Sequence, residues 1–149
     1  MTKDFADFLQ SLNSEGVAYV VIGGIAVLAH IPYRTTRDLD VLIQPTPENA
    51  EKARRAVAAW GSFEPDFTAA DFIAGDILSF GGLQRVEIHS RVPGVEWEDV
   101  WKGRVESELL GVPTSFAGID ELIRMKAATG NAEKDLPDLQ RLRALRKSK

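Results

Sequence analysis

Two aspartates, Asp38 and Asp40, stand on either side of one apolar residue at the start of the segment 38–43. Side chains alternate along a strand, so both carboxylates project from one face while Leu39 and Val41 project from the other. Two carboxylates on one face repel each other and resist burial. A divalent cation between them removes both costs, and Mg²⁺ commonly binds through one or two carboxylates and the phosphate oxygens of a substrate. The spacing therefore favours a magnesium site.

Two adjacent glycines, Gly23 and Gly24, follow the apolar run 17–22 and precede the short segment 25–30. Glycines let a phosphate approach the backbone, and the start of the next helix offers free N–H groups and the positive end of its dipole. A lone pair of glycines is more often a turn, and a lone Asp-x-Asp is more often a surface loop. In the order strand, Gly-Gly, helix, loop, Asp-x-Asp, strand, the two together indicate a nucleotide site. The chain has neither a P-loop nor a Gly-x-Gly-x-x-Gly motif.

The order Gly-Gly, thirteen further residues and Asp-Leu-Asp resembles the active-site signature of the polymerase-β-like nucleotidyltransferase superfamily. The resemblance implies a mixed β-sheet flanked by helices, and transfer of a nucleoside monophosphate from an NTP to an acceptor. It also implies two Mg²⁺ ions, with Mn²⁺ as the alternative, held by Asp38, Asp40 and a third acid on a neighbouring strand. The ions would stabilise the entering and leaving oxygens during displacement at the α-phosphorus. Gly23 and Gly24 would cradle the β- and γ-phosphates.

Glu87 is the candidate for the third acid, as a catalytic and metal-binding residue. Alternation along its apolar run puts Arg85, Glu87 and His89 on one face and Val86 and Ile88 on the other. Many members of the superfamily have aspartate at the matching position, whereas here the residue is longer by a methylene. His89 shares the face of Glu87, and both a place at the site and a purely structural role are open for it.

The likeness covers most of residues 17–145. Three blocks, 34–43, 85–101 and 119–142, are similar to small bacterial nucleotidyltransferases of abortive-infection and toxin–antitoxin systems. In those proteins, a Lys-x-x-Ala-like helix and a later basic-Asp-x-x-Asp segment complete the site. The matching residues here are Lys126, Thr129 in place of the alanine, Lys134, Asp135 and Asp138.

Three charged residues have alternative interpretations. Lys126 shares the inward helix face of Leu122 and Ile123, where it either reaches the triphosphate as a point charge or only extends along the surface to solvent. Arg37, next to the Asp-x-Asp pair, is a candidate nucleotide-binding residue, with a solvated loop as the alternative. Asp135 is a candidate catalytic residue, either as a general base or as a residue that supports the metal ligands without binding the metal. The alternative is that it caps the start of a helix.

The elements that hold these residues follow from hydrophobic periodicity and turn residues. The sequence predicts, in chain order, helix 3–14, strand 17–22, helix 25–30, strand 38–43, helix 48–60 and two strands joined at Gly81-Gly82. A short helix around Trp97 and Trp101, a brief hairpin or strand within 106–117 and helix 119–129 follow. The final helix has an inward stripe of Leu136, Leu139, Leu142 and Leu145. This order favours a mixed sheet flanked by helices in a single α/β domain spanning 1–149, with a core of about 17–91 and a C-terminal helical part of about 95–147.

The overall composition agrees with a globular domain. The chain has 149 residues, a net charge of −4, 44% hydrophobic residues and 27% charged residues. It has no cysteine, which excludes disulfides and thiolate chemistry. No apolar run approaches about 20 residues, the length that spans a bilayer, and the N-terminal segment lacks the pattern of a cleavable signal. We therefore expect a cytoplasmic protein that contacts no membrane.

The acceptor stays open among an RNA end, a protein hydroxyl and a small molecule. No second domain that could hold a large acceptor is evident, so a partner subunit or a homodimer is expected. A toxin–antitoxin or phage-defence role rests on the resemblance alone. The alternative function is a non-catalytic module that keeps the nucleotide pocket and acts as a regulatory protein or antitoxin. A glycosyltransferase with an Asp-x-Asp motif is a further alternative, which the length of the chain disfavours.

Overall fold

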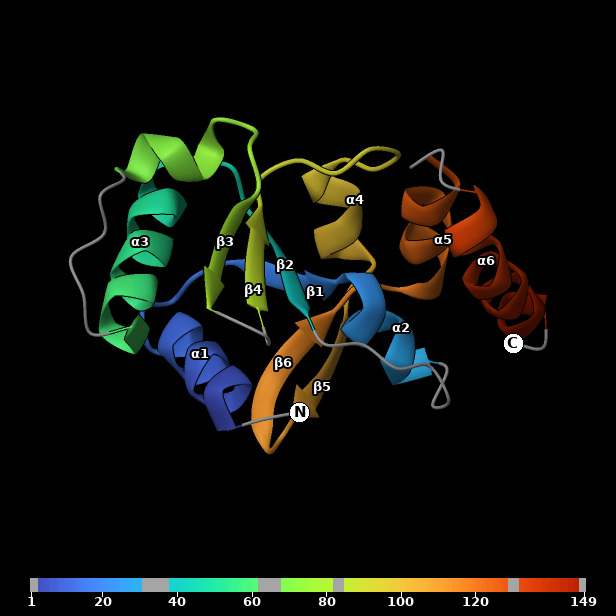
Figure 1. Cartoon of the computed structure of the whole chain (residues 1–149), viewed down its shortest axis with the longest axis horizontal. Helices are drawn as coiled ribbons and strands as arrows, with labels where there is room; N and C mark the ends of the chain where they lie inside the picture. Colours follow the sequence, from blue (N-terminus) through green and yellow to red (C-terminus); the bar gives the residue numbers. More distant parts are fainter. Residues whose placement is uncertain (1–2, 31–37, 62–67, 82–84, 129–131, 148–149) are drawn as a thin grey trace.

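In the part of the chain that the structure describes, six strands form one mixed sheet (Figure 1). The structure is a computed structural model that describes residues 3–30, 38–61, 68–81, 85–128 and 132–147. The strands are β1 (Tyr19–Ile22), β2 (Leu39–Ile43), β3 (Leu78–Gly81), β4 (Arg85–His89), β5 (Val105–Leu109) and β6 (Val112–Phe116). Their order across the sheet is β3-β4-β2-β1-β6-β5. β1 and β2 are antiparallel, whereas β2 and β4 run parallel, as do β1 and β6.

Helices cover both sides of this sheet. They are α1 (Lys3–Ser14), α2 (Gly23–His30), α3 (Pro47–Gly61), the 3₁₀ helix η1 (Ala69–Ile73), α4 (Trp97–Lys102), α5 (Ile119–Ala128) and α6 (Ala132–Lys147). Figure 1 shows α1, α3 and η1 on one side of the strands and α4, α5 and α6 on the other. α2 begins where β1 ends, contacts β1 and β2, and is contacted in turn by α5 and α6. Within the described ranges, no helix combines the length and apolarity needed to cross a bilayer.

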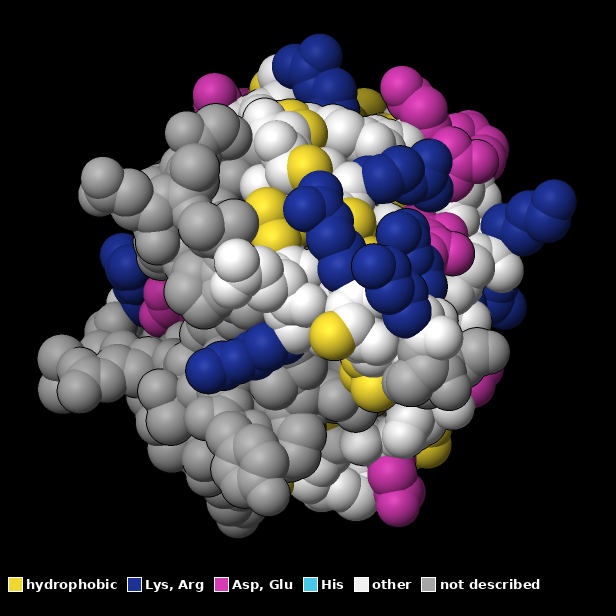
Figure 2. All heavy atoms as spheres, turned by 90° about the vertical axis from the view of Figure 1, so that its right-hand side faces the viewer, with side chains coloured by type: hydrophobic (Ala, Val, Ile, Leu, Met, Phe, Trp, Pro, Cys, Tyr) yellow, Lys and Arg dark blue, Asp and Glu magenta, His cyan; other side chains and the backbone are white. Residues whose placement is uncertain are grey.

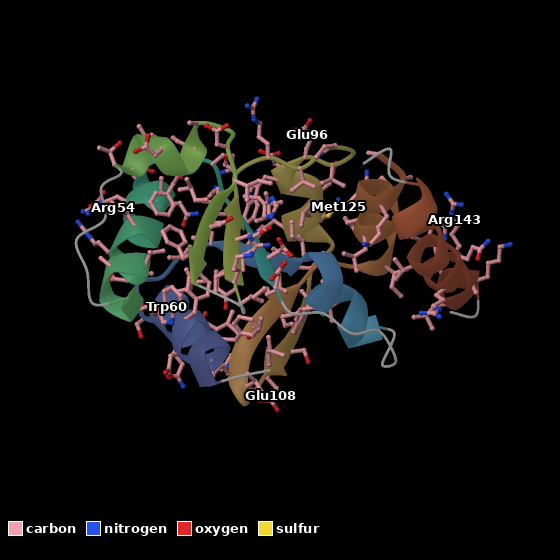
Figure 3. All side chains as sticks on the ribbon, in the orientation of Figure 1. Arg54, Trp60, Glu96, Glu108, Met125 and Arg143 are labelled. Atoms are coloured by element: carbon pink, nitrogen blue, oxygen red, sulfur yellow. The ribbon has the colours of Figure 1, made fainter. Side chains whose placement is uncertain are left out.

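The apolar face of α1 is buried against α3 and the sheet. Phe5, Phe8, Leu9 and Leu12 recur at helical spacing and are at most 1% exposed. The ring of Phe8 meets Trp60 edge-on, with centroids 5.2 Å apart, and Figure 3 shows Trp60 at the end of α3 that lies beside α1. Burial of such side chains stabilises the fold by about 1.5–3 kcal/mol each, which holds α1 and α3 to the strands.

The predicted order of elements is confirmed, and the structure adds one element. η1 buries Phe72, and Asp71 accepts a hydrogen bond from the backbone N–H of Thr68, 2.7 Å away. The signal was present in the sequence, because an acid three residues after a threonine is a capping pattern at a helix start. A second difference is that α2 begins at Gly23 rather than at residue 25.

The final helix begins earlier than its leucine stripe indicates. α6 begins at Ala132, which places Asp135 inside the helix and makes the N-cap interpretation of this residue wrong. The physical reason is that alanine and glutamate are strong helix formers and that acids near a helix start complement its dipole. Leu139 and Leu142 are buried as predicted, whereas the side chains of 131–138 lie outside the described residues.

Basic side chains gather on the face that α5 and α6 present in Figure 2. The last turn of α6 contains Arg146 and Lys147, where cations complement the negative end of the helix dipole. A nitrogen of Arg146 also lies 3.4 Å from a carboxylate oxygen of Asp120 on α5. This is the arrangement of a solvated helix face.

A buried asparagine joins α3 to the ends of β1 and β2. Asn49 is 4% exposed. Its Nδ2 donates to the carbonyls of Ala18 and Gln44, each 3.0 Å away, and its Oδ1 accepts from the N–H of Ala18 at 2.8 Å. The amide is therefore fully paired, and it ties the β1–β2 pair to the helix layer.

We expect Asn49→Ala to lower the free energy of unfolding by about 2 kcal/mol, because the half-buried backbone groups of Ala18 and Gln44 lose their hydrogen bonds to this buried amide. Urea denaturation followed by circular dichroism measures the change. Asn13→Ala is the matched control: Asn13 also makes two side-chain hydrogen bonds, but it is exposed and should cost clearly less. Equal losses in the two variants would contradict the role given to burial.

Candidate metal centre

Strand pairing brings Asp40 and Glu87 side by side. β2 and β4 run parallel, and in their register Asp40 is the partner of Glu87. Paired residues of neighbouring strands project from the same face of a sheet, so the two carboxylates stand next to each other. The predicted alternation in β4 is confirmed, since Val86 and Ile88 are buried while Glu87 and His89 are only partly so.

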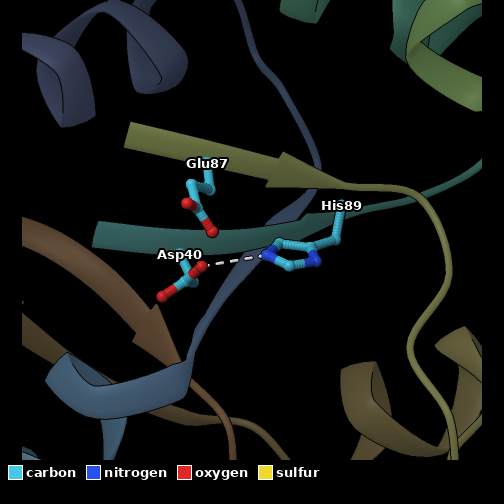
Figure 4. A group of neighbouring side chains, drawn as sticks. All are labelled: Asp40, Glu87 and His89. Atoms are coloured by element: carbon cyan, nitrogen blue, oxygen red, sulfur yellow. Dashed lines mark hydrogen bonds and ion pairs between the residues drawn. The ribbon is translucent and has the colours of Figure 1, made fainter. Parts of the chain in front are cut away.

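His89 joins these acids in a group of three side chains with metal-ligating atoms (Figure 4). Its Nε2 lies 2.9 Å from Oδ1 of Asp40, and one ligand atom each from Asp40, Glu87 and His89 lie within 4.8 Å of one another. The side chains of Asp40, Glu87 and His89 are 18%, 20% and 14% exposed. The group is therefore shielded over most of its surface yet open to solvent, and its donor atoms fit a divalent cation.

Asp38 stands at the edge of this group. It directly precedes β2, its side chain is 36% exposed, and its Oδ2 lies 3.8 Å from Nη2 of Arg85. The same Nη2 lies 3.9 Å from Oε1 of Glu87, so one guanidinium faces two carboxylates. Of the three acids predicted to bind metal, the structure thus brings Asp40 and Glu87 together and leaves Asp38 outside the group that they form with His89.

The surroundings of Glu87 disfavour its negative charge. Burial is the main cause that raises the pKa of Glu87. A side-chain hydrogen bond with Asp40 and the charges of Asp40 and Asp38 raise it further, while His89 lowers it. Without a cation, this carboxyl therefore holds its proton to a higher pH than an ordinary glutamate. A bound cation would reverse that preference, because it favours the ionised form.

This raised pKa predicts the pH dependence of stability in the metal-free protein. Between the ordinary glutamate pKa of about 4.3 and the raised folded-state pKa of Glu87, the folded state binds more protons than the unfolded state. The contribution of Glu87 to stability must therefore fall as pH rises through this window. We expect Glu87→Gln to unfold with a higher free energy than wild type at neutral pH, with the difference vanishing below the window. Urea titrations at several pH values in a chelator measure it, and a difference independent of pH would contradict the assignment.

Gly23 connects the double glycine to the acids. Its φ is +71°, in the left-handed region that favours glycine, and a Cβ at this position would lie 2.6 Å from Oδ2 of Asp40. α2 begins here with no acid in its first turn, so the positive end of its dipole lies beside the Asp40 carboxylate. Glycine is therefore required both by the backbone and by the neighbouring side chain, and Gly24 follows in the first turn of α2.

The other predicted site residues lie farther along the chain or outside the described ranges. Lys126 is half-buried on α5, a helix that contacts α2. Asp135 lies on α6, which also contacts α2, but its side chain is not among those described. Arg37 falls outside the described residues altogether. The structure places the helices of Lys126 and Asp135 next to α2, and the roles of these three residues stay predictions.

A pocket of about 500 Å³ opens at the carboxyl ends of β2 and β4. Its lining includes Leu42, Ile73, Ser90, Val92 and Trp97. The ring of Trp97 stacks on that of Trp101, with centroids 5.2 Å apart. Ser90 directly follows His89 and is 3% exposed, and its hydroxyl has no hydrogen-bond partner among the described residues. The pocket thus has a mixed wall, because Arg91, Glu96 and Glu98 line it beside the apolar residues, and the Ser90 hydroxyl in it is unpaired.

We expect Ser90→Ala to raise the free energy of unfolding by about 1 kcal/mol, because an unpaired buried hydroxyl is costly to remove from water. Thermal and urea unfolding measure it. Ser11→Ala is the matched control, since the Ser11 hydroxyl donates to the carbonyl of Ala56 at 2.7 Å, and this variant should lose stability. A loss in Ser90→Ala of similar size would mean that its hydroxyl is satisfied in solution.

No protein-family model and no curated protein matches this chain. What indicates a function is therefore the geometry of the acids and of Gly23. The sequence leaves the role of His89 open. Strand alternation places His89 on the face of Glu87, but only the contact of its Nε2 with Asp40, 2.9 Å away, makes it a member of the group.

Proposed function

We propose that the protein is a divalent-metal-dependent nucleotidyltransferase, which transfers a nucleoside monophosphate from an NTP to a hydroxyl group of an acceptor. The observation that carries the proposal is the close approach of Gly23, where α2 begins, to Asp40, the strand partner of Glu87. A phosphate group received at the start of α2 would lie beside a cation held by the acids. This juxtaposition is what NTP chemistry requires, and isolated surface acids have no need of it.

The proposed reaction is an in-line displacement at the α-phosphorus. The acceptor oxygen forms a bond to this phosphorus while the bond to the bridging oxygen of the β-phosphate breaks, and pyrophosphate leaves. The proton of the acceptor hydroxyl passes to a carboxylate, for which Asp135 is the candidate from the sequence. A divalent cation, when bound, supplies stabilisation of the negative charge that develops on the phosphate oxygens.

The residues of the chain have separate tasks in this proposal. Asp40 and Glu87 hold the cation, with Asp38 at the edge of the group. Gly23 and the start of α2 receive the β- and γ-phosphates through backbone N–H groups. Lys126 and Arg37 would add positive charge to the triphosphate, as the sequence indicates. Because the substrate is an NTP, the protein is expected to act in the cytoplasm, alone or as a toxin–antitoxin component with a partner subunit.

The test uses the same NTP labelled at two positions. The purified protein is incubated with Mg²⁺ or Mn²⁺, with α-³²P- and γ-³²P-labelled forms of each of the four NTPs, and with RNA, a protein extract or a small-molecule pool as acceptor. The proposal expects label from the α-position, and none from the γ-position, to become attached to an acceptor, together with release of pyrophosphate. Transfer of the γ-label instead, or transfer that survives excess chelator, would refute it.

The second candidate is a non-catalytic nucleotide-binding module. Arg85 favours it, because its guanidinium lies within 4 Å of oxygens of both Asp38 and Glu87 and neutralises acids without a metal. This candidate expects NTP binding with no transfer to any acceptor. Equilibrium binding of a fluorescent NTP analogue, together with no transfer of the α-label in the assay above, would identify the module, whereas binding with transfer would identify the enzyme.

A further inference from the structure

We infer that His89 is a metal ligand together with Asp40 and Glu87, and that the centre prefers a first-row transition metal such as Mn²⁺ to Mg²⁺. The inference goes beyond the proposed function, which requires only carboxylates. The catalytic use of the metal rests on the proposed function, whereas the binding of the metal by His89 does not.

The distances within the group are close to those of ligands on one ion. Two neighbouring ligands of an octahedral ion with bonds of about 2.1 Å are about 3 Å apart, and opposite ligands are about 4.2 Å apart. Nε2 of His89 lies 2.9 Å from Oδ1 of Asp40, and the ligand atoms of the three residues lie within 4.8 Å of one another. Figure 4 shows the imidazole and the Glu87 carboxylate on the same side of the strands as Asp40. A cation would replace the His89–Asp40 hydrogen bond with only small movements.

The backbone holds the three donors in these places. Asp40 and Glu87 are register partners in the parallel β2–β4 pair, and His89 is the partner of Leu42 in the same pair. Asp40 is further confined by Gly23, whose backbone leaves no room for a Cβ beside Oδ2. Donors on two paired central strands need little rearrangement to bind, so the donor set rather than flexibility decides which metal is chosen.

The donor set contains one imidazole nitrogen and two carboxylates. Mg²⁺ selects oxygen ligands, whereas imidazole suits transition metals, whose affinities rise from Mn²⁺ towards Cu²⁺. Among these ions, Mn²⁺ also accepts carboxylate, water and phosphate oxygens in octahedral geometry. The nitrogen of His89 therefore raises affinity for Mn²⁺ relative to Mg²⁺, while the remaining positions stay available for water or phosphate.

The test is pulsed electron paramagnetic resonance of the Mn²⁺-loaded protein without nucleotide. We expect ¹⁴N modulation from a coordinated imidazole in the wild type and its loss in His89→Gln, in which the amide keeps a hydrogen-bond donor for Asp40. The chain has only one other histidine, His30, so His30→Gln is the matched control and should retain the signal. Modulation that persists in His89→Gln, or that is absent from the Mn²⁺-loaded wild type, would overturn the inference.

Calorimetric titrations give a second measurement. We expect the wild type to bind Mn²⁺ at least about tenfold more tightly than Mg²⁺, and His89→Gln to lose most of this preference. If the variant does not fold, the resonance experiment is repeated on wild-type protein that contains ¹⁵N-labelled histidine. A coordinated imidazole must then give a ¹⁵N pattern in place of the ¹⁴N pattern. No binding of Mn²⁺, or equal preference in wild type and variant, counts against His89 as a ligand.

The two proposals fail in different ways. Histidine-derived modulation without transfer of the α-label would support the metal centre and refute the nucleotidyltransferase proposal. Transfer of the α-label with Mn²⁺ bound through oxygen alone would support the enzyme and refute His89 as a ligand. His89 would then be a residue that positions Asp40.

Discussion

Asp40→Asn is expected to slow nucleotidyl transfer at least about 10³-fold while leaving the fold intact. The substitution keeps the shape of the side chain and removes the charge that interacts with Glu87 and His89 and lies beside Gly23. Loss of one anionic ligand from a metal centre removes several kcal/mol of transition-state stabilisation, and each 1.4 kcal/mol or so is a factor of ten in rate. Initial rates of α-label transfer measure the loss at saturating metal.

Stability separates this loss from misfolding. Removing the charge of Asp40 relieves repulsion with Glu87, so the free energy of unfolding of Asp40→Asn should be unchanged or higher in the metal-free protein. Asp120→Asn is the matched control, because this carboxylate on α5 is 67% exposed and, among the described residues, makes a surface ion pair with Arg146. It should transfer label at the wild-type rate. A variant Asp40→Asn that is folded and retains more than about a tenth of the activity would contradict the site as proposed.

Gly23→Ala is expected to lower the free energy of unfolding by about 3 kcal/mol and to displace the Asp40 carboxylate. A residue with a Cβ is strained at a φ of +71°, at a cost of about 1–2 kcal/mol. The new Cβ would also lie 2.6 Å from Oδ2 of Asp40 and 3.1 Å from its Cβ, closer than van der Waals contact, which adds a similar amount. Metal affinity should fall together with stability, because the same movement disturbs the ligand.

The chain contains a matched control for the backbone strain. Gly16 has nearly the same φ, +69°, but a Cβ there meets nothing within 4 Å, so Gly16→Ala should cost about 1 kcal/mol. The difference between the two variants measures the contact with Asp40. In a double-mutant cycle, Asp40→Ala should recover part of the loss in Gly23→Ala, since it removes the nearest atom. Equal costs for the two glycines, with no coupling to Asp40, would disprove the contact between the double glycine and the acids.

Local patterns in the sequence were sufficient to predict the helices and strands and the face that each of them buries. The helical spacing of Phe5, Phe8 and Leu12 and the alternation in 85–89 depend only on neighbours along the chain, and the structure confirms both. The same is true of the strands around Gly23 and Asp40. Local signals compete at element ends, however. The capping pattern at Thr68 starts η1, which hydrophobic spacing does not predict, and good helix formers at 132–133 start the last helix before Asp135.

By itself, the sequence determined which residues could do chemistry and which way each strand turns them, because side-chain alternation is a property of the backbone alone. Only the tertiary structure decided that β2 pairs with β4 in the register that sets Asp40 beside Glu87, that Asp38 stays at the edge with Arg85, and that His89 turns towards Asp40. Register between strands that are distant in sequence is chosen by the burial of whole faces. No short stretch of residues contains that information.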